Sequence, residues 1–341
     1  MEQTYVTREQ IAAALDVKPS AYMGRELDRA CRAGSRSAEG LLHRIFYPEV
    51  MARTFDYPSV TGSYNMIYFD ERQLITLTAA SSGGVALALG NVLLRPDNIG
   101  PPYEWIELDR NSTAAFSGGP QRSTTLDGVW GFRNDEEVIG TLTAGVDSSV
   151  TLVTLSAPAD HGALLRIDSE RMLVVGQRWV SSGQTASALG NGKADTVLTV
   201  QTGSAFTPGE RIVLDGERLE VQDIAGNVLT VRRAVDGTVL AAHAGATPIF
   251  WAHQLQVERG VLGTAAASHL TAAVTQRFVP PSGVNELSQA YAEDYFLQRN
   301  AGYARTAGTG ESERQVSGRS IVNIETRVRA LYGRKVRTRA V

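Results

Sequence analysis

Apolar residues recur at helical spacing over the first fifty positions of the chain. Thr7 and Gln10 have the spacing of a capping box, in which each side chain bonds the backbone amide of the other residue. Such short helices bury too little surface to be stable alone. The pattern predicts three of them: one that begins at Thr7 and ends at Lys18-Pro19-Ser20, a second from about Ala21 to Ala33 that Gly34 closes, and a third from Ser37 to Phe46.

From Ala52 the period of the apolar positions changes from 3.6 to 2, which predicts β-strands. Turn signals such as Gly83-Gly84, Pro101-Pro102 and Asp127-Gly128 separate the runs. The expected strands are Tyr64 to Phe69, Gln73 to Leu77, Ala86 to Leu94, Tyr103 to Leu108 and Ser123 to Phe132.

Helical spacing returns after Pro280-Pro281. We expect a helix from Glu286 to Arg299, a flexible loop rich in Gly, Thr and Ser from Asn300 to Gln315, and an amphipathic helix from Ser320 to Tyr332. Helices at both ends that enclose β-structure predict an α+β fold. In this fold the terminal helices pack into one core and the β-modules are inserted into it.

One part of the chain is duplicated. Residues 212–221 match residues 165–174, and residues 229–238 match residues 255–264. In both copies of the second segment a histidine follows at the same spacing: His243 in one copy and His269 in the other. The repeated residues are spread over a whole module, so they indicate determinants of a fold rather than an active site.

The second copy lies inside the first. In the inner copy a short turn, Gln222 to Val228, joins the two halves; in the outer copy the same junction opens at Val175 and closes near Gln254. A module tolerates insertion at a hairpin tip when it is a self-sufficient scaffold. Gly190 to Lys193 is expected to be the hinge into the inner copy.

These patterns divide the chain into four parts. They are a helical part at 1–50, a β-rich region at 51–147, the nested repeat at 148–279 (outer copy 148–175 plus 255–275, inner copy 195–249), and a C-terminal helix, loop and basic tail at 280–341.

Composition excludes several classes of protein. Of the 341 residues 20% are charged, and the formal net charge is −3, so the chain as a whole is not suited to coating nucleic acid. A single cysteine, Cys31, excludes an internal disulfide framework and a multi-thiolate zinc site, and we expect it to be a buried thiol. The N-terminus lacks the pattern of a signal peptide, and the longest apolar run, Gly84 to Leu94, is too short to span a bilayer. We expect a protein that folds in a cytoplasm without contacting a membrane.

Catalytic motifs are scarce, so we expect neither an enzyme nor a cofactor. Two or three of His161, His243, His253 and His269 could converge on a metal, but His243 and His269 occupy equivalent repeat positions. The interpretation we favour is that each of them closes the loop after Gly-Thr in its own copy, with no metal site.

The acidic residues and the one Gly-rich stretch have simple structural interpretations. Asp135-Glu136-Glu137 is expected to be a surface run on a loop, and Ser117 to Pro120 lacks the lysine of a phosphate-binding loop. Asp168 and Glu170 recur as Asp215 and Glu217. Each Asp-x-Glu-Arg segment is expected to form a turn with a local ion pair, worth under about 1 kcal/mol if exposed.

The C-terminal end carries the one distinctive charge pattern. From Arg319 to Arg339 there are seven basic residues and one acid, Glu325. Such a tail binds phosphates in a salt-dependent manner, docks into an acidic groove of a protein, or is merely solvated.

Four short motifs resemble a known family. They are Leu41-Leu-His-Arg-Ile-Phe-Tyr-Pro48, Thr54-Phe-Asp-Tyr-Pro58, Gly100-Pro-Pro-Tyr-Glu-Trp-Ile-Glu-Leu108 and Gln121-Arg-Ser-Thr-Thr-Leu-Asp-Gly-Val-Trp-Gly131. In them the chain resembles the head-to-tail connector (adaptor) proteins of long-tailed bacteriophages, over about residues 7 to 135 and more loosely over 285 to 341.

The resemblance implies a structural protein of the virion neck, assembled in the host cytoplasm. It implies a dodecameric ring that joins the portal to the next neck or tail-completion protein and extends the channel through which genomic DNA passes without sequence-specific binding. It also implies that the C-terminal tail reaches the portal or a neighbouring subunit. The portal-binding candidates are Arg327, Arg329, Leu331, Tyr332, Arg334, Lys335, Arg337 and Arg339.

Two other functions stay open at this point. A tail-associated module could hold a glycan on the β-repeats, for which Trp179 and Trp251 are the only candidate aromatic platforms. A cell-wall hydrolase is the third hypothesis, but no residue stands out as its catalytic group.

Overall fold

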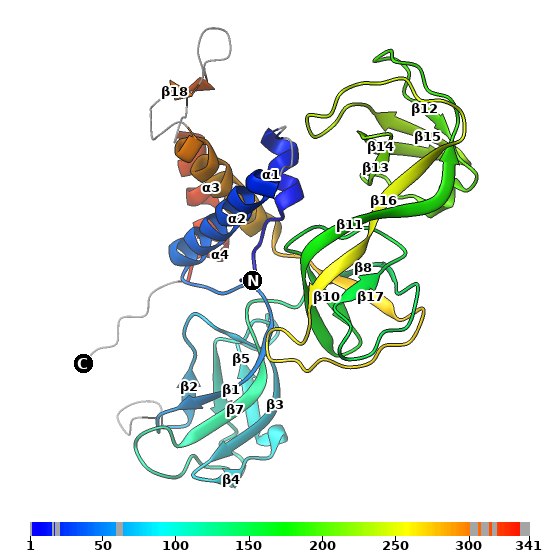
Figure 1. The fold of residues 1–341 in the computed structure, drawn as a ribbon. Coiled ribbons are helices and arrows are strands. Elements are labelled where there is room, and N and C mark those ends of the chain that lie inside the picture. The colour runs from blue at the N-terminus through cyan, green and yellow to red at the C-terminus, as the bar shows by residue number, and fades with distance from the viewer. Residues whose placement is uncertain are drawn as a thin grey trace.

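The computed structural model describes residues 2–15, 17, 21–58, 64–300, 306–307, 314–315 and 319–334. The fold is α+β, as predicted: helices from the two ends of the chain pack together, and three antiparallel sheets lie between them in the sequence (Figure 1). The expected helix stop at residues 18–20, most of the expected loop at 300–315, and the tail residues Lys335, Arg337 and Arg339 lie outside the described residues.

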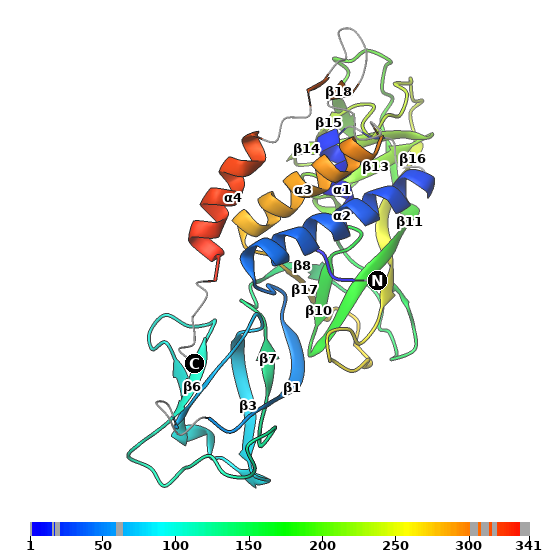
Figure 2. The ribbon, with the colours of Figure 1, turned by 90° about the vertical axis from the view of Figure 1, so that its left-hand side faces the viewer.

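The helical core consists of α1 (Arg8–Leu15), α2 (Ala21–Leu42), α3 (Ser282–Asn300) and α4 (Arg319–Tyr332). The helices α2 and α3 lie side by side in both views, with α4 against α3 (Figure 2). The predicted capping box of α1 is confirmed, since Thr7 N donates to Gln10 Oε1 at 2.9 Å and Gln10 N donates to Thr7 Oγ1 at 3.3 Å. Between α3 and α4, the short strands β18 (Thr306–Ala307) and β19 (Arg314–Gln315) pair with each other.

The second and third predicted helices are one continuous helix, α2. Gly34 does not end it but lies where α2 and α3 cross. A Cβ atom at Gly34 would lie 2.3 Å from Ser288 O and 2.9 Å from Ala292 N. The glycine therefore serves close helix packing, a requirement that is visible only when α3 is in place.

No helix of the described residues is long and apolar enough to cross a membrane.

A β-domain follows α2. Its larger sheet has the order β1 (Glu49–Phe55), β7 (Thr124–Trp130), β3 (Leu74–Ser82), β4 (Val85–Ala86), and its smaller sheet has the order β2 (Met66–Tyr68), β6 (Trp105–Leu108), β5 (Val92–Arg95). Trp130 is fully buried between Phe55 and Phe69. The pattern did not predict β1, and the strand expected at Ala86 to Leu94 is interrupted by a short 3₁₀-helix, Leu89–Asn91.

The nested repeat folds into two small β-barrels, which form a continuous ten-stranded sheet (Figure 1). The outer barrel contains β8 (Glu136–Thr141), β9 (Leu152–Thr154), β10 (Leu164–Ile167), β17 (Val274–Phe278), the first half of β11 (Glu170–Ala186) and the second half of β16 (Thr247–Glu258). The inner barrel contains the remaining halves of β11 and β16 with β12 (Val197–Thr199), β13 (Arg211–Leu214), β14 (Glu217–Ala225) and β15 (Val228–Arg232).

Backbone hydrogen bonds close both barrels. In the outer barrel Ser156 N donates to Thr141 O at 2.9 Å, and in the inner barrel Ser187 N donates to Thr199 O at 2.9 Å. Closure removes the unpaired strand edges on which sheets aggregate. Each barrel has its own apolar core, around Leu165 and Leu255 in the outer barrel and around Ile212 and Leu229 in the inner barrel.

The insertion is at the hairpin tip, as predicted, but the connection differs from the expected hinge. The turn between β14 and β15 is only Gly226-Asn227, and the strands fill the rest of the expected turn. Because β11 and β16 run unbroken from one barrel into the other, two paired strands join the barrels. Gly190 to Lys193 instead lies in the loop between β11 and β12, where Gly192 N donates to Asp195 Oδ2. The outer barrel also includes β8, which precedes the expected start at residue 148.

Candidate functional site: the duplicated carboxylate network and the C-terminal segment

Glu170 is the centre of a buried network in the outer barrel. The preceding turn has Asp168 in the left-handed region (φ 52°), and β11 then begins with the Glu170 side chain directed inward, completely buried. The carboxylate accepts two bonds from Arg259, at 2.7 and 2.8 Å, and one each, at 2.9 Å, from Gly260 N, Ala267 N and His269 Nε2. Such paired Arg–carboxylate bonds are among the strongest in proteins.

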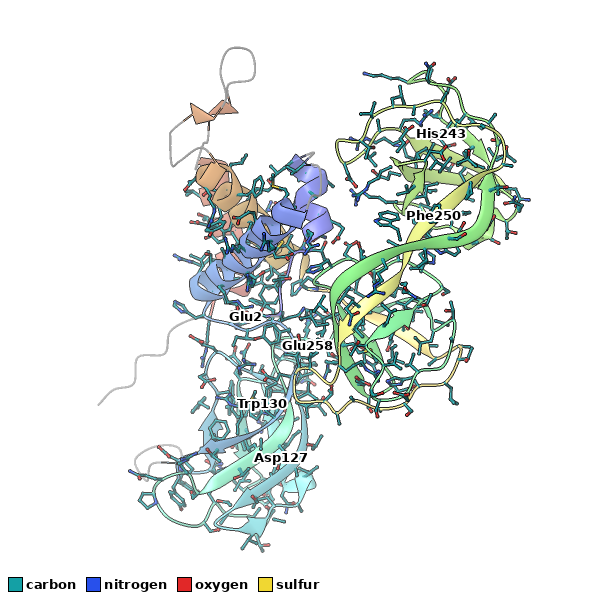
Figure 3. All side chains as sticks on the ribbon, in the orientation of Figure 1. Glu2, Asp127, Trp130, His243, Phe250 and Glu258 are labelled. Atoms are coloured by element: carbon teal, nitrogen blue, oxygen red, sulfur yellow. The ribbon has the colours of Figure 1, made fainter. Side chains whose placement is uncertain are left out.

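Glu217 makes the same network in the inner barrel. It accepts two bonds from Arg233, at 2.7 and 2.8 Å, and one each from Ala234 N (3.0 Å), Ala241 N (3.0 Å) and His243 Nε2 (2.8 Å). His243 lies inside the inner barrel (Figure 3). The residues that we define as the carboxylate network are therefore Glu170, Arg259, His269 and Asp168, and their inner equivalents Glu217, Arg233, His243 and Asp215.

Each network histidine faces a carboxylate with both ring nitrogens. His269 Nδ1 lies 2.7 Å from Asp168 Oδ2, and His243 Nδ1 lies 3.1 Å from Asp215 Oδ2. Each ring therefore joins the loop that follows Gly-Thr to the turn and strand that carry the aspartate and the glutamate. The interpretation of these histidines as loop-closing residues is confirmed.

Burial alone would raise the pKa of the two central glutamates. The hydrogen bonds from Arg259, Ala267 N, His269 and Gly260 N outweigh it and lower the pKa of Glu170 to about 2. The same balance, with Arg233 and His243 as the main donors, lowers the pKa of Glu217 to about 2. Both carboxylates are thus ionised across the neutral range and stabilise the folded barrel.

The expected local ion pair within each Asp-x-Glu-Arg segment is wrong. Successive residues of a strand point to opposite faces, so Arg171 and Arg218 point away from the carboxylates. Arg171 donates to Asn134 Oδ1 at 3.2 Å, and Arg218 pairs with Asp236 at 3.3 Å. The arginines that do bind, Arg259 and Arg233, were missed. The signal that could have found them is their equivalent position in the two copies of the repeat: Arg259 directly precedes Gly260, and Arg233 directly precedes Ala234.

The four histidines do not converge. His253 Nε2 bonds Glu210 Oε1 at 2.7 Å, and His161 lies beside Asp28 and Arg8 near α1. In the part of the chain that the structure describes, no three His, Cys, Asp or Glu residues are placed to hold a metal ion.

The carboxylate network holds loops rather than a reactive group. Arg259 also donates to Asp147 O, Val150 O and Ala267 O, and Arg233 makes the equivalent bonds to Gly190 O, Asp195 O and Ala241 O. Each arginine therefore joins two loops at one end of its barrel: the loop that carries the arginine, and the loop between β8 and β9 in the outer barrel or between β11 and β12 in the inner one. The arrangement suits a structural role, since both glutamates are shielded from solvent and fully hydrogen-bonded.

The acidic run at Asp135-Glu136-Glu137 is not a loop. Glu136 and Glu137 lie in β8, where Glu136 pairs with Arg166 at 2.7 Å and Glu137 pairs with Arg277. Cys31 is buried as expected, and burial raises the pKa of its thiol well above the ordinary range.

The C-terminal candidates are partly engaged within the fold. Tyr332 packs on Phe46 and Phe132, and Arg334 N donates to Leu42 O at 3.1 Å while its guanidinium binds Phe69 O. Arg327 pairs with Glu286 at 2.5 Å on the surface of the helical core. Leu331 is 68% exposed, and Arg329 O accepts a bond from Gly333 N.

The two candidate aromatic platforms are partly covered. The Arg218 guanidinium lies 5.3 Å from the ring centre of Trp179. Trp251 stacks on His253 with ring centres 4.0 Å apart and also contacts Phe206. Each ring therefore already has another side chain packed against it.

In comparisons with known proteins, no protein-family model, no curated protein and no solved structure matches this chain.

Proposed function

We propose that this protein is a structural component of a bacteriophage neck. It assembles into a ring that joins the portal to the tail and extends the DNA channel, and it acts by assembly rather than by covalent chemistry. The proposal rests on the resemblance of its short motifs to head-to-tail connector proteins.

The packing of these motifs is the observation that carries the proposal. Phe46 belongs to the first motif and packs on Phe132, which directly follows the last motif; their ring centres are 5.2 Å apart. Phe46 also packs on Tyr332 of α4, with ring centres 6.3 Å apart. Phe55 of the second motif packs on Trp130 of the last. Segments far apart in the sequence thus form one unit, in which helices from both chain ends hold the β-domain. Such a unit suits a ring subunit with the barrels projecting from it.

Portal binding is assigned here to the last seven residues. Tyr332 and Arg334 contribute to the helical core, so a deletion after Leu331 would remove core contacts together with the tail. A deletion after Arg334 removes Lys335, Arg337 and Arg339 but keeps those contacts, and it separates binding from folding.

The test is electron microscopy of the purified protein, alone and mixed with the portal from the same genome. We expect closed rings that stack coaxially on the portal. The chain ending at Arg334 should form rings that do not join the portal, and the full-length triple variant Lys335→Glu, Arg337→Glu, Arg339→Glu should do the same. Failure of the wild-type chain to form rings or to bind the portal would refute the proposal. Normal joining by both variants would refute the assignment of the tail.

A further inference from the structure

The two barrels make different contacts with the rest of the protein. The outer barrel has a docking face, on which Leu164 and Leu262 pack in the helical core and Leu262 O accepts a hydrogen bond from Val50 N of β1 at 2.9 Å. On the equivalent docking face of the inner barrel the two positions are Arg211 and Asp236, which pair with each other at 3.1 Å. Apolar docking therefore holds the outer barrel, whereas the inner barrel projects on β11 and β16 (Figure 1).

A pocket opens in the surface of the inner barrel. Its volume is about 360 Å³, and it lies between the loop that joins β11 to β12 and the paired strands β14 and β15. Of the described residues that line it, three are basic and none is acidic: Lys193, Arg232 and Arg233. Arg233 is neutralised by Glu217 of the carboxylate network. Two basic groups of the pocket therefore remain.

These two basic groups are weakly engaged within the protein. The Arg232 side chain is 57% exposed, and its ion pair with Glu220 spans 3.9 Å. Across the part of the chain that the structure describes, no carboxylate pairs with Lys193. The nearby Asp195 is turned toward its own loop, where its Oδ2 accepts a bond from Gly192 N at 2.9 Å. The pocket thus carries an excess of positive charge, which favours an anionic ligand.

A β-bulge places a polar side chain at the same pocket. The register of β14 against β15 shifts between Val221 and Asp223, so Gln222 is the bulged residue. Bulges often redirect a side chain next to a binding site. Within the described residues, neither the Gln222 amide nor the hydroxyl of Thr196, which lines the pocket from the loop, makes a hydrogen bond. Both groups are therefore available to polar groups of a ligand.

The outer barrel has the same bulge with different chemistry. Its register shifts between Val174 and Gly176, which makes Val175 the counterpart of Gln222. Glu258 stands at the position of Arg232. The barrel fold is therefore compatible with an apolar and an acidic residue at these two places, and it does not require the polar and basic ones.

The loop that carries Lys193 is also longer in the inner barrel. The carbonyl groups of Gly190 and Asp195 bind the network arginine there, and those of Asp147 and Val150 bind it in the outer barrel. Four residues lie between the first two carbonyl groups, whereas two lie between the second two. Because the outer barrel closes with the shorter loop, the longer loop is an addition that brings a lysine to the pocket.

We propose that this pocket of the inner barrel binds a small molecule that carries a carboxylate or phosphate group together with hydroxyl groups, as an anionic sugar does. The anionic group binds Lys193 and Arg232, the two charges of the pocket that the fold leaves available. Hydroxyl groups of the ligand bond Gln222 and Thr196. This site does not depend on the neck function, because it follows from the differences between the two barrels alone.

Three sugars test the proposal. Glucuronate carries a carboxylate, glucose 6-phosphate carries a phosphate, and glucose is the uncharged control. Binding to the full chain is followed by calorimetry at low salt, where charge pairs are least screened. We expect saturable binding of at least one anionic sugar, at least about tenfold tighter than that of glucose, since charge-assisted hydrogen bonds account for the difference. The tighter of the two anionic sugars identifies the anionic group that the pocket prefers.

Protein variants locate the binding. Lys193→Ala and Arg232→Ala should each weaken binding of the tighter anionic sugar at least about tenfold. Gln222→Val, which introduces the residue of the outer barrel, should weaken it less. The matched control is Arg178→Ala, an exposed arginine of β11 that does not line the pocket, and it should leave binding unchanged.

Four outcomes would overturn the proposal. They are equal binding of the three sugars, no binding of either anionic sugar at millimolar concentration, unchanged binding by Lys193→Ala or by Arg232→Ala, and equal weakening by Arg178→Ala. Because the substituted side chains are exposed, the variants should fold as the natural chain does, and circular dichroism checks this.

Discussion

The outer and inner barrels have nearly identical interiors and different exteriors. Both place a buried glutamate between an arginine and a histidine, with equivalent hydrogen bonds to the carboxylate. Their docking faces differ, with Leu164 and Leu262 in the outer barrel and Arg211 and Asp236 in the inner one. The comparison indicates that the carboxylate network is required for this barrel, whereas the face depends on what packs against it.

Removal of the network arginines should have the largest effect. Each of Arg259→Ala and Arg233→Ala leaves a buried carboxylate without its main partner, which costs about 3–5 kcal/mol of unfolding free energy. Because each barrel has its own core, Arg233→Ala should loosen the inner barrel alone, and Arg259→Ala should also loosen the docking on the helical core. Urea unfolding gives the size of the effect, and hydrogen exchange locates it.

Arg232→Ala is the matched control for these variants. Its side chain is exposed, and its ion pair with Glu220 spans 3.9 Å, so the change should stay within about 0.5 kcal/mol. Equal loss of protection in both barrels of Arg233→Ala would show that the barrels are not independent.

Exchange of the residues on the docking faces should reduce stability less, and the loss should be larger in the outer barrel than in the inner one. Leu262→Asp puts a charge into the apolar contact with the helical core and should cost about 2 kcal/mol. Asp236→Leu removes a buried carboxylate whose two partners, Arg211 and Arg218, stay partly exposed to solvent, and should cost about 1 kcal/mol. Thermal unfolding of both variants measures the difference. Equal losses would contradict the view that only the outer face is docked.

Mild acid should have the smallest effect, and it should be the same in both barrels. The folded pKa of Glu170 and Glu217 is about 2, below the ordinary 4.5, so their stabilisation is complete above pH 4.5 and is lost as the pH falls toward 2. Between pH 7 and pH 4 each network should lose about 1 kcal/mol. The variants Glu170→Gln and Glu217→Gln should each be less stable at pH 7. In each variant the loss of stability between pH 7 and pH 4 should be smaller by about 1 kcal/mol, because one of the two networks no longer titrates. An unchanged pH dependence in both would contradict these pKa values.

Several features of the structure were predictable because they depend on local sequence. The capping box of Thr7 and Gln10 uses groups three residues apart, and the terminal helices follow from apolar spacing within one element. The nesting of the two modules followed from matching residues, because a hairpin tip is the one place where a closed barrel can be opened without loss of its core. In each case the physical cause lies within a short stretch or within the repeat itself.

Other features were beyond prediction because their causes join distant segments. Gly34 was interpreted as a helix end, but the backbone of α3 at Ser288 requires it. The Asp-x-Glu-Arg segment at residues 168–171 was expected to hold a local ion pair, whereas the partner of Glu170 is Arg259, which β16 brings back beside β11. Tyr332 was a candidate for portal binding, and its packing on Phe46 and Phe132 joins segments that no local pattern connects.

The sequence by itself thus determined the α+β class, the terminal helices and the nested duplication, because local propensity and internal repetition specify them. Only the tertiary structure decided which arginine meets each glutamate, where α2 ends and which barrel face is covered. These outcomes depend on which surfaces meet, and a surface such as the face of Leu262 or Asp236 acquires its role only from the residues packed against it.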